Sequence, residues 1–445
     1  MVRWLRTPLP FLDDMTARYG NVFTLRLPRI ATPIVVFADP VAVRDLWTGD
    51  PHTLHAGEAN LILRSVVGKH SLLVLDGDRH LRERRLMLPP FHGDRMRAYG
   101  EAMREATSRE IDRWPIGRQF SFHASTQTIT LDVIMRTVFG VGADDPQLAP
   151  LRDALVRWTN LGTSPLGTAL LLLTPPDRAD AVRELATGRF GRFLPWAPLV
   201  RAQTETDRLV RELIAARRRE GSGGREDILS MLLDARDEAG AAMTDDQLRD
   251  EMLTLLLAGH ETTATTLAWA IHHLLEHREW LDRVRAEVRE VVGTGPVQPE
   301  HIERLVLLDA AIKETLRLTP IIPMVGRVIK RPATVGGIEL PAGAVALASI
   351  YLVHHRADLW PEPRRFDPAR FVGKKADPAT YFPFGGGVRR CLGMAFASYE
   401  MKIVLATILA RVELTSAGGQ RVRLVRRGIT LAPSGGMPIV ATARR

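Results

Sequence analysis

The 445-residue chain has one cysteine, only six lysines among its 60 basic residues, and 6% aromatic residues. A single cysteine cannot form an internal disulfide, nor a multi-cysteine zinc or iron–sulfur site. This scarcity of cysteine favours a reduced, cytoplasmic location. The fractions of hydrophobic residues (45%) and charged residues (25%) are those of a globular chain, and they argue against a disordered one.

The sequence also lacks a segment with the composition of a membrane span. The longest uncharged run, 158–176, is long enough, but it contains Pro165, two glycines and several Ser and Thr residues. Residues 1–14 have the composition of neither a signal peptide nor a transit peptide. We therefore expect no membrane anchor, and the sequence leaves open whether the natural chain begins further upstream.

The net charge of +9 is carried almost entirely by arginine. Most arginines alternate with acidic residues, as in 283–290, which is typical of a solvated helix face. The short basic clusters at 82–85 and 217–219 lack the interleaved aromatic residues that a single-stranded nucleic-acid site uses. We therefore expect no nucleic-acid partner, whereas a basic surface suits an acidic protein partner.

The hydrophobic pattern predicts a mainly α chain with a small β region. Helical periodicity extends over about 78–318 and 394–412, and strand-like runs lie at about 21–40, 325–350 and in the C-terminal tail. A Gly336–Gly337 pair predicts a tight hairpin over 333–340. A capping box at 244–247 predicts a long helix that ends near Trp280. No repeat or linker divides residues 1–445, so we expect a single domain.

The lone cysteine lies in a glycine-rich segment just before a predicted helix. Cys391 belongs to Phe384-Gly-Gly-Gly-Val-Arg-Arg-Cys-Leu-Gly393, and the helix is expected to begin at Met394. The positive end of the helix, together with Arg389 and Arg390, favours a thiolate over a thiol. The alternatives are a buried structural cysteine and a phosphate-binding glycine loop, although the loop lacks the Gly-Lys-Ser/Thr ending of the latter.

This segment resembles the cysteine-ligand loop of the cytochrome P-450 family of haem-thiolate monooxygenases, through Phe384, Gly387, Arg389, Cys391 and Gly393. The resemblance extends from about residue 11 to about residue 439 and implies a cytochrome P-450 fold. It also implies that Cys391 is the metal ligand of heme b (iron protoporphyrin IX). In that family the thiolate pushes electron density toward the iron and favours O–O cleavage.

The middle of the long helix, Ala258-Gly-His-Glu-Thr-Thr263, resembles the helix with which the family handles oxygen. The resemblance implies that Thr262 orders dioxygen and its water and that Glu261 supplies protons from solvent. It places Ala258 and Gly259 against the haem, where a glycine leaves room for a ligand or a widened turn. The neighbouring His260 should turn away from that face, so we do not assign it as a ligand. A helix kink with internally packed threonines is the alternative.

Several charged residues match further positions of the family. The resemblance assigns four residues to the two haem propionates: His80, Arg84, Arg327 and Arg389. Glu314 and Arg317, three residues apart, resemble a pair that braces the cysteine loop together with an arginine corresponding to Arg370. Here Ala369 replaces an acid that is often present in the family. A pair with this spacing can also be a solvated ion pair of little energetic value.

The resemblance implies a monooxygenase that inserts one oxygen atom from O2 into an apolar molecule, by hydroxylation or epoxidation. The expected pocket walls are rich in aliphatic residues, which favours a fatty acid, terpenoid or steroid-like substrate; these walls are 52–75, 159–200, 253–258, 321–325 and 435–437. We expect a monomer that receives electrons from a separate ferredoxin or flavodoxin with its NAD(P)H-dependent reductase. A peroxide-driven haem-thiolate peroxygenase and a non-catalytic haem sensor or carrier are the alternatives. Whether Arg64 or Lys69 binds a substrate carboxylate stays open.

Overall fold

A computed structural model of the whole chain describes residues 3–4, 7–26, 32–91, 95–140, 149–175, 178–189, 191–221, 223–418 and 422–445. Part of the β segment predicted at 21–40, namely 27–31, lies outside the described residues. The described helices are α2 (Pro8–Tyr19), α3 (Pro40–Thr48), α4 (Ala56–Ala59), α5 (Arg64–Val67), α6 (Gly77–Met87), α7 (Arg95–Arg113), α8 (Phe122–Phe139), α9 (Ala149–Gly162), α10 (Pro165–Leu173), α11 (Ala179–Thr187), α12 (Ala197–Glu220), α13 (Ile228–Asp234), α14 (Asp245–Glu276), α15 (Arg278–Val292), α16 (Val306–Leu318), α17 (Ile350–His354) and α18 (Met394–Arg411).

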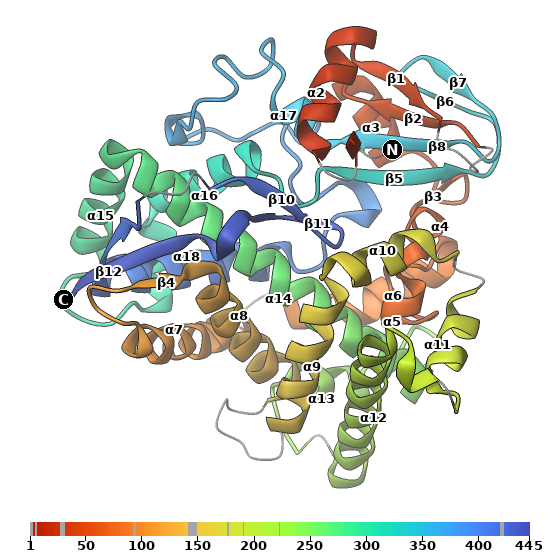
Figure 1. Cartoon of the computed structure of the whole chain (residues 1–445), viewed down its shortest axis with the longest axis horizontal. Helices are drawn as coiled ribbons and strands as arrows, with labels where there is room; N and C mark the ends of the chain where they lie inside the picture. The colour runs from red at the N-terminus through yellow and green to blue at the C-terminus, as the bar shows by residue number, and fades with distance from the viewer. Residues whose placement is uncertain are drawn as a thin grey trace.

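The described strands are β1 (Val22–Leu25), β2 (Ile34–Phe37), β3 (Leu54–His55), β4 (Gln119–Ser121), β5 (Met324–Ile329), β6 (Ala333–Val335), β7 (Ile338–Leu340), β8 (Val345–Ser349), β9 (Val412–Ser416), β10 (Leu424–Arg427), β11 (Thr430–Pro433) and β12 (Pro438–Arg444). Helices form most of the molecule and the larger sheet lies at one side, near the N-terminus (Figure 1). The mainly α class with a small β region is therefore confirmed.

Helix α14 crosses the middle of the molecule and packs along α8 (Figure 1). Its predicted start is confirmed, because the Thr244 side chain accepts from the backbone N–H of Gln247 and the Gln247 side chain accepts from the N–H of Thr244. Its predicted end was wrong: the helix stops at Glu276 and α15 begins at Arg278. The 32 residues span about 48 Å at 1.5 Å per residue.

The larger sheet has the strand order β1-β2-β8-β5-β3. Its β2–β8 pair is parallel, whereas the other neighbours are antiparallel. The predicted hairpin is confirmed as β6–β7, and Gly336 and Gly337 provide the positive φ values of 56° and 77° that its turn requires. This sheet and its helices enclose one hydrophobic core, while the helical body encloses a second, larger one.

The second sheet was predicted only in part: strands were expected in the C-terminal tail, where β9 and β12 lie, but β4 and its pairing with them were not. Strand β4 interrupts the stretch predicted as helical, and Val412, predicted as the last residue of a helix, instead opens β9. Both strands pair with β12 at the end of the chain, in the order β4-β12-β9. Short strands of this kind depend on a partner distant in sequence, so their own residues carry a weak signal.

Among the residues that the structure describes, no helix combines the length and the apolar character that crossing a membrane requires.

Candidate functional site

The segment around Cys391 folds into a tight loop ahead of α18. The backbone N–H of Cys391 donates to the carbonyl of Phe384 at 2.9 Å, and the N–H of Arg390 donates to the carbonyl of Gly387 at 3.1 Å. The cysteine is exposed, yet protein surrounds its thiol closely enough for burial to raise the thiol pKa. A side chain that is both accessible and enclosed lies in a recess of the protein.

The electrostatics of this thiol differ from the sequence-based expectation. Burial is the largest effect and favours the neutral thiol, while the N–H of Gly393 and the cation of Arg84 lower the pKa. Arg389, which was expected to favour the thiolate, pairs with Asp76, with Nη2 and Oδ1 2.5 Å apart. Burial therefore raises the pKa of the Cys391 thiol more than the N–H of Gly393 and the charge of Arg84 lower it.

Glycines in the loop allow it to lie against Trp47 of α3. Gly387 has a φ of +63°, and a Cβ atom there would lie 2.1 Å from the carbonyl oxygen of Trp47. At Gly386 a Cβ atom would lie 2.6 Å from the Trp47 ring. The Trp47 ring also packs edge-on against Phe382, with their ring centres 5.6 Å apart. The shape of the cysteine loop thus depends on a backbone approach that only glycine permits.

Gly387→Ala is expected to distort the cysteine loop, whereas Gly385→Ala is the matched control. Both residues have positive φ, which costs an alanine about 1–2 kcal/mol, but Gly385 has no atom within 4 Å of a built Cβ. The contact with the Trp47 backbone should cost Gly387→Ala a further 1–3 kcal/mol or so. Urea unfolding measures the difference, and equal stability of the two variants would contradict the close approach.

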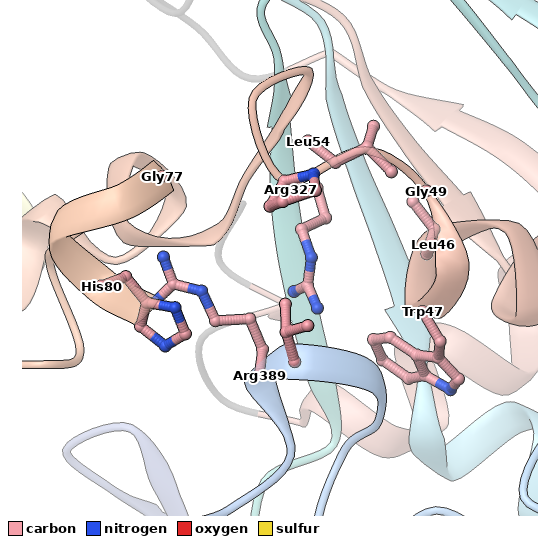
Figure 2. A pocket seen from close by; sticks show the side chains of 10 residues that line it. Leu46, Trp47, Gly49, Leu54, Gly77, His80, Arg327 and Arg389 are labelled. Atoms are coloured by element: carbon pink, nitrogen blue, oxygen red, sulfur yellow. The ribbon is translucent and has the colours of Figure 1, made fainter. Parts of the chain in front are cut away.

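A cationic cleft borders the same loop. His80 of α6, Arg327 of β5 and Arg389 converge on a small cleft (Figure 2). Burial and three neighbouring arginines lower the pKa of His80 to about 3, and burial together with Arg389 lowers the pKa of Arg327 to about 10. Asp76 supplies one compensating acid, so the cleft keeps an excess of positive charge that suits an anionic group.

Arg84 lies one helical turn after His80 on α6. Burial lowers the pKa of Arg84, and the thiol of Cys391 is the group that raises it. The structure therefore brings the four predicted cationic residues and Cys391 into one neighbourhood, although Arg389 donates in addition to the carbonyls of Leu72 and Leu75.

The predicted oxygen-handling residues on α14 differ in their exposure to solvent. Ala258 is exposed and Thr262 is half-buried, whereas Leu256, His260 and Glu261 are buried. The Thr262 hydroxyl donates to the carbonyl of Ala258 at 2.6 Å. Open space therefore adjoins this one side of the central helix.

The structure explains Gly259 and His260 by helix packing. A Cβ atom on Gly259 would lie 2.6 Å from Cδ1 of Ile134 on α8, so the glycine opens toward α8 and not toward a ligand as expected. The Nε2 atom of His260 lies 3.1 Å from the carbonyl oxygen of Gln127, also on α8. The expectation that His260 turns away from the open side is thus supported.

Glu261 is buried and held by groups from other elements. Its Oε2 accepts from Nε2 of Gln127 at 2.6 Å, and its Oε1 lies 3.2 Å from Nε of Arg427 and 3.7 Å from Nε2 of His123. Burial raises the pKa of Glu261, while Arg427 and Gln127 lower it. The sequence analysis missed Arg427, because a lone arginine in a C-terminal strand carries no local signal.

The predicted bracing pair is fully buried and forms two hydrogen bonds. Arg317 donates to the two carboxylate oxygens of Glu314 at 2.6 and 2.8 Å, and Arg370 lies 3.3 Å from Glu314. Arg317 also donates to the carbonyls of His354, Pro363 and Arg365. The pair thus fastens α16 to the segment that leads into the cysteine loop.

These features fit a flat, dianionic cofactor that carries its own metal ligands. The described residues contain no group of three or more His, Cys, Asp or Glu side chains that could hold a metal ion. They do contain one accessible thiol in a recess and an excess of cationic groups beside it. Such a donor set suits an iron porphyrin, in which the protein adds one axial ligand and binds two propionates.

Comparison with known proteins agrees with this class. The family model for cytochrome P-450 matches residues 4–440. The chain is 40% identical to cytochrome P-450 135B1 of Mycobacterium tuberculosis, over 100% of this chain and 89% of that protein. It is 35% identical to cytochrome P-450 137 of the same species, over 94% of this chain and 82% of the relative.

Solved structures give the same result. The haem domain of cytochrome P-450DA has a TM-score of 0.83 at 25% identity, over 98% of this chain and 93% of that one. A cyanobacterial cytochrome P-450, 120A1, with bound retinoic acid shares the fold at a TM-score of 0.83 and 24% identity, over 99% and 97% of the two chains. The chain therefore belongs to the cytochrome P-450 family, whose members are haem-thiolate monooxygenases with heme b as cofactor.

Proposed function

We propose that Cys391 is the axial ligand of the haem iron in a monooxygenase that acts on an apolar substrate. The observation that carries the proposal is the accessible thiol of Cys391 in a recess at the start of α18, beside a cleft with excess positive charge. When bound, the haem supplies the oxygen and electron chemistry, and the protein supplies the ligand, the charges and the pocket.

Three groups of residues would hold the haem. His80, Arg84, Arg327 and Arg389 would bind the propionates, since a buried carboxylate requires cationic donors. Phe384, Gly387 and Gly393 would shape the loop under the cofactor, and Gly387 does so through its approach to Trp47. On α14, Ala258 would face the haem. Gly259 would contribute only its backbone, because a Cβ atom there would collide with Ile134.

Glu261 and Thr262 would move protons to the reacting oxygen. The Thr262 hydroxyl lies on the open side of α14 and can hold a water, while burial raises the pKa of the Glu261 carboxyl above its ordinary value. A carboxyl whose pKa is raised toward neutrality is an effective proton donor.

The proposed substrate is a fatty acid, terpenoid or steroid-like molecule. Helix α10 is nearly all apolar, yet Gly167 is its only fully buried residue, and it contacts the equally apolar segment Leu61–Leu63. On α14, Leu255 and Leu257 are also incompletely buried. Aliphatic side chains left without full burial beside the cofactor provide a surface that an apolar ligand can cover.

We further propose that residues 1–445 act as one cytoplasmic domain and as a monomer, with electrons from a ferredoxin or flavodoxin and its NAD(P)H-dependent reductase. The basic charge of the chain supports an acidic donor. Arg390, next to the axial cysteine, is exposed, as are Lys374 and Lys375 in the segment before the loop. Complementary charge of this kind accelerates encounter between redox proteins.

Reconstitution tests the substrate and the electron donor together. The purified haem protein is titrated with fatty acids, terpenoids and steroids while its Soret band is recorded, and turnover is then measured with ferredoxin or flavodoxin and a reductase. We expect a ligand-induced Soret shift with one of these classes, and rates that fall as ionic strength rises. A shift only with charged, water-soluble ligands would contradict the apolar substrate, and salt-independent rates would contradict the charge-guided donor.

A further inference from the structure

Arg427 joins three elements that are distant in sequence. It is the last residue of β10, and its Nε lies 3.2 Å from Oε1 of Glu261 on α14. Its Nη2 donates to Oδ1 of Asn160 on α9 at 3.2 Å. The next residue, Gly428, donates its backbone N–H to the Thr168 hydroxyl of α10 at 3.2 Å. Contacts from α9 and α10 therefore hold this part of the chain beside Glu261.

The carboxylate that Arg427 faces has few other partners. From α8, Gln127 donates to Oε2, and the neutral, buried His123 lies 3.7 Å from Oε1 and 3.0 Å from the Thr265 hydroxyl. Burial, with help from Arg427, holds the pKa of His123 at about 3, so that this ring carries no charge. Arg427 is thus the cation that opposes the burial of Glu261 among the described residues.

The Glu261–Arg427 ion pair is close, but its geometry is not that of a hydrogen bond. Neither Oε1 of Glu261 nor Nε of Arg427 has a hydrogen-bond partner among the described residues, although the two atoms are only 3.2 Å apart. The attraction is therefore mostly Coulombic, and it lacks the directional bond that would lock the carboxylate in place. Such a pair stabilises the negative charge of the carboxylate, and its two side chains can still separate.

We propose that Arg427 is a positioning residue for Glu261: it keeps the carboxylate ionised and turned toward α8, and Glu261 takes up the proton that it delivers when this pair opens. The proposal rests on the proton-supplying role given to Glu261 under the proposed function. Asn160 supports it by fixing the guanidinium from α9.

The expected direction follows from the charges. An opposite charge at this distance lowers a carboxyl pKa by roughly 1–3 units, so removing it should raise the pKa of Glu261 above its already raised value. The protonated form of Glu261 should then persist to higher pH. Arg426, one residue earlier, packs over Trp4 instead and provides a control with the same change of charge.

Infrared difference spectroscopy tests this without any turnover. The protonated-carboxyl band that Glu261→Gln removes is followed against pH in the haem-loaded wild type and in four variants. We expect its midpoint to rise by at least about 1 pH unit in Arg427→Gln and by less in Asn160→Ala. Arg427→Lys should restore it in large part, and Arg426→Gln should leave it unchanged. An unchanged midpoint in both Arg427→Gln and Asn160→Ala overturns the proposal.

Turnover separates this proposal from the proposed function. The pH profile of turnover and the product formed per NAD(P)H should shift in Arg427→Gln in parallel with the infrared midpoint, and not in Arg426→Gln. A shifted midpoint with an unshifted pH profile would refute the positioning role. Absence of a thiolate-type carbon monoxide spectrum in the wild type would instead refute the proposed function, while the infrared titration would still report on the ion pair.

Discussion

Replacement of Cys391 by alanine should remove the strongly red-shifted Soret band of the reduced, carbon monoxide-bound protein and abolish monooxygenation. Cys391 is the only cysteine, so no other thiolate can replace it as iron ligand. Loss of a residue that merely supports a metal ligand typically costs 10–100-fold in affinity or activity. Loss of the ligand itself should therefore lower turnover by more than about a hundredfold.

Val388→Ala is the matched control for this experiment. Val388 belongs to the same loop, but it is 44% exposed and brings neither a ligand atom nor a charge to the site. The variant should keep both the red-shifted band and turnover. A red-shifted band that persists in Cys391→Ala would contradict the assignment, and so would a wild-type spectrum typical of histidine-ligated haem.

Glu314→Gln should be among the most damaging single changes outside the haem contacts. Glu314 and Arg317 are both fully buried, and the substitution leaves the Arg317 charge without its partner. Removing one member of a buried pair typically costs about 3–5 kcal/mol. Arg317 also donates hydrogen bonds to three backbone carbonyls in the segment before the cysteine loop. We therefore expect Glu314→Gln to unfold at a lower urea concentration and to lose haem during purification.

Glu205→Gln is the matched control, because it removes a Glu-x-x-Arg pair that is exposed to solvent instead of buried. Glu205 and Arg208 on α12 have the same spacing and form bonds of similar length, but both side chains are exposed to solvent. Their attraction is screened by water, so this variant should match the wild type in urea unfolding and haem content. Similar losses in the two variants would show that burial does not decide the value of the Glu314–Arg317 pair.

The features that sequence analysis predicted well depend on neighbours along the chain. The Gly336–Gly337 hairpin and the capping box of α14 are set by a few consecutive residues, because turn φ values and helix caps are local. The cysteine loop is equally local, since Cys391, its glycines and the start of α18 are contiguous. The end of α14 was misplaced because Arg278 to Trp280 are themselves helical and belong to the next helix.

The sequence by itself determined the family and the mainly helical class, and it singled out Cys391 as the candidate iron ligand. Only the tertiary structure decided which charges meet. It joined β4 and β9 through β12, directed Gly259 toward Ile134, and placed Arg427 against Glu261, 166 positions earlier in the chain. Local preferences select a turn, a cap or a motif, whereas pairing between distant segments depends on how the whole core packs. A lone arginine or a short strand therefore shows its role only after folding.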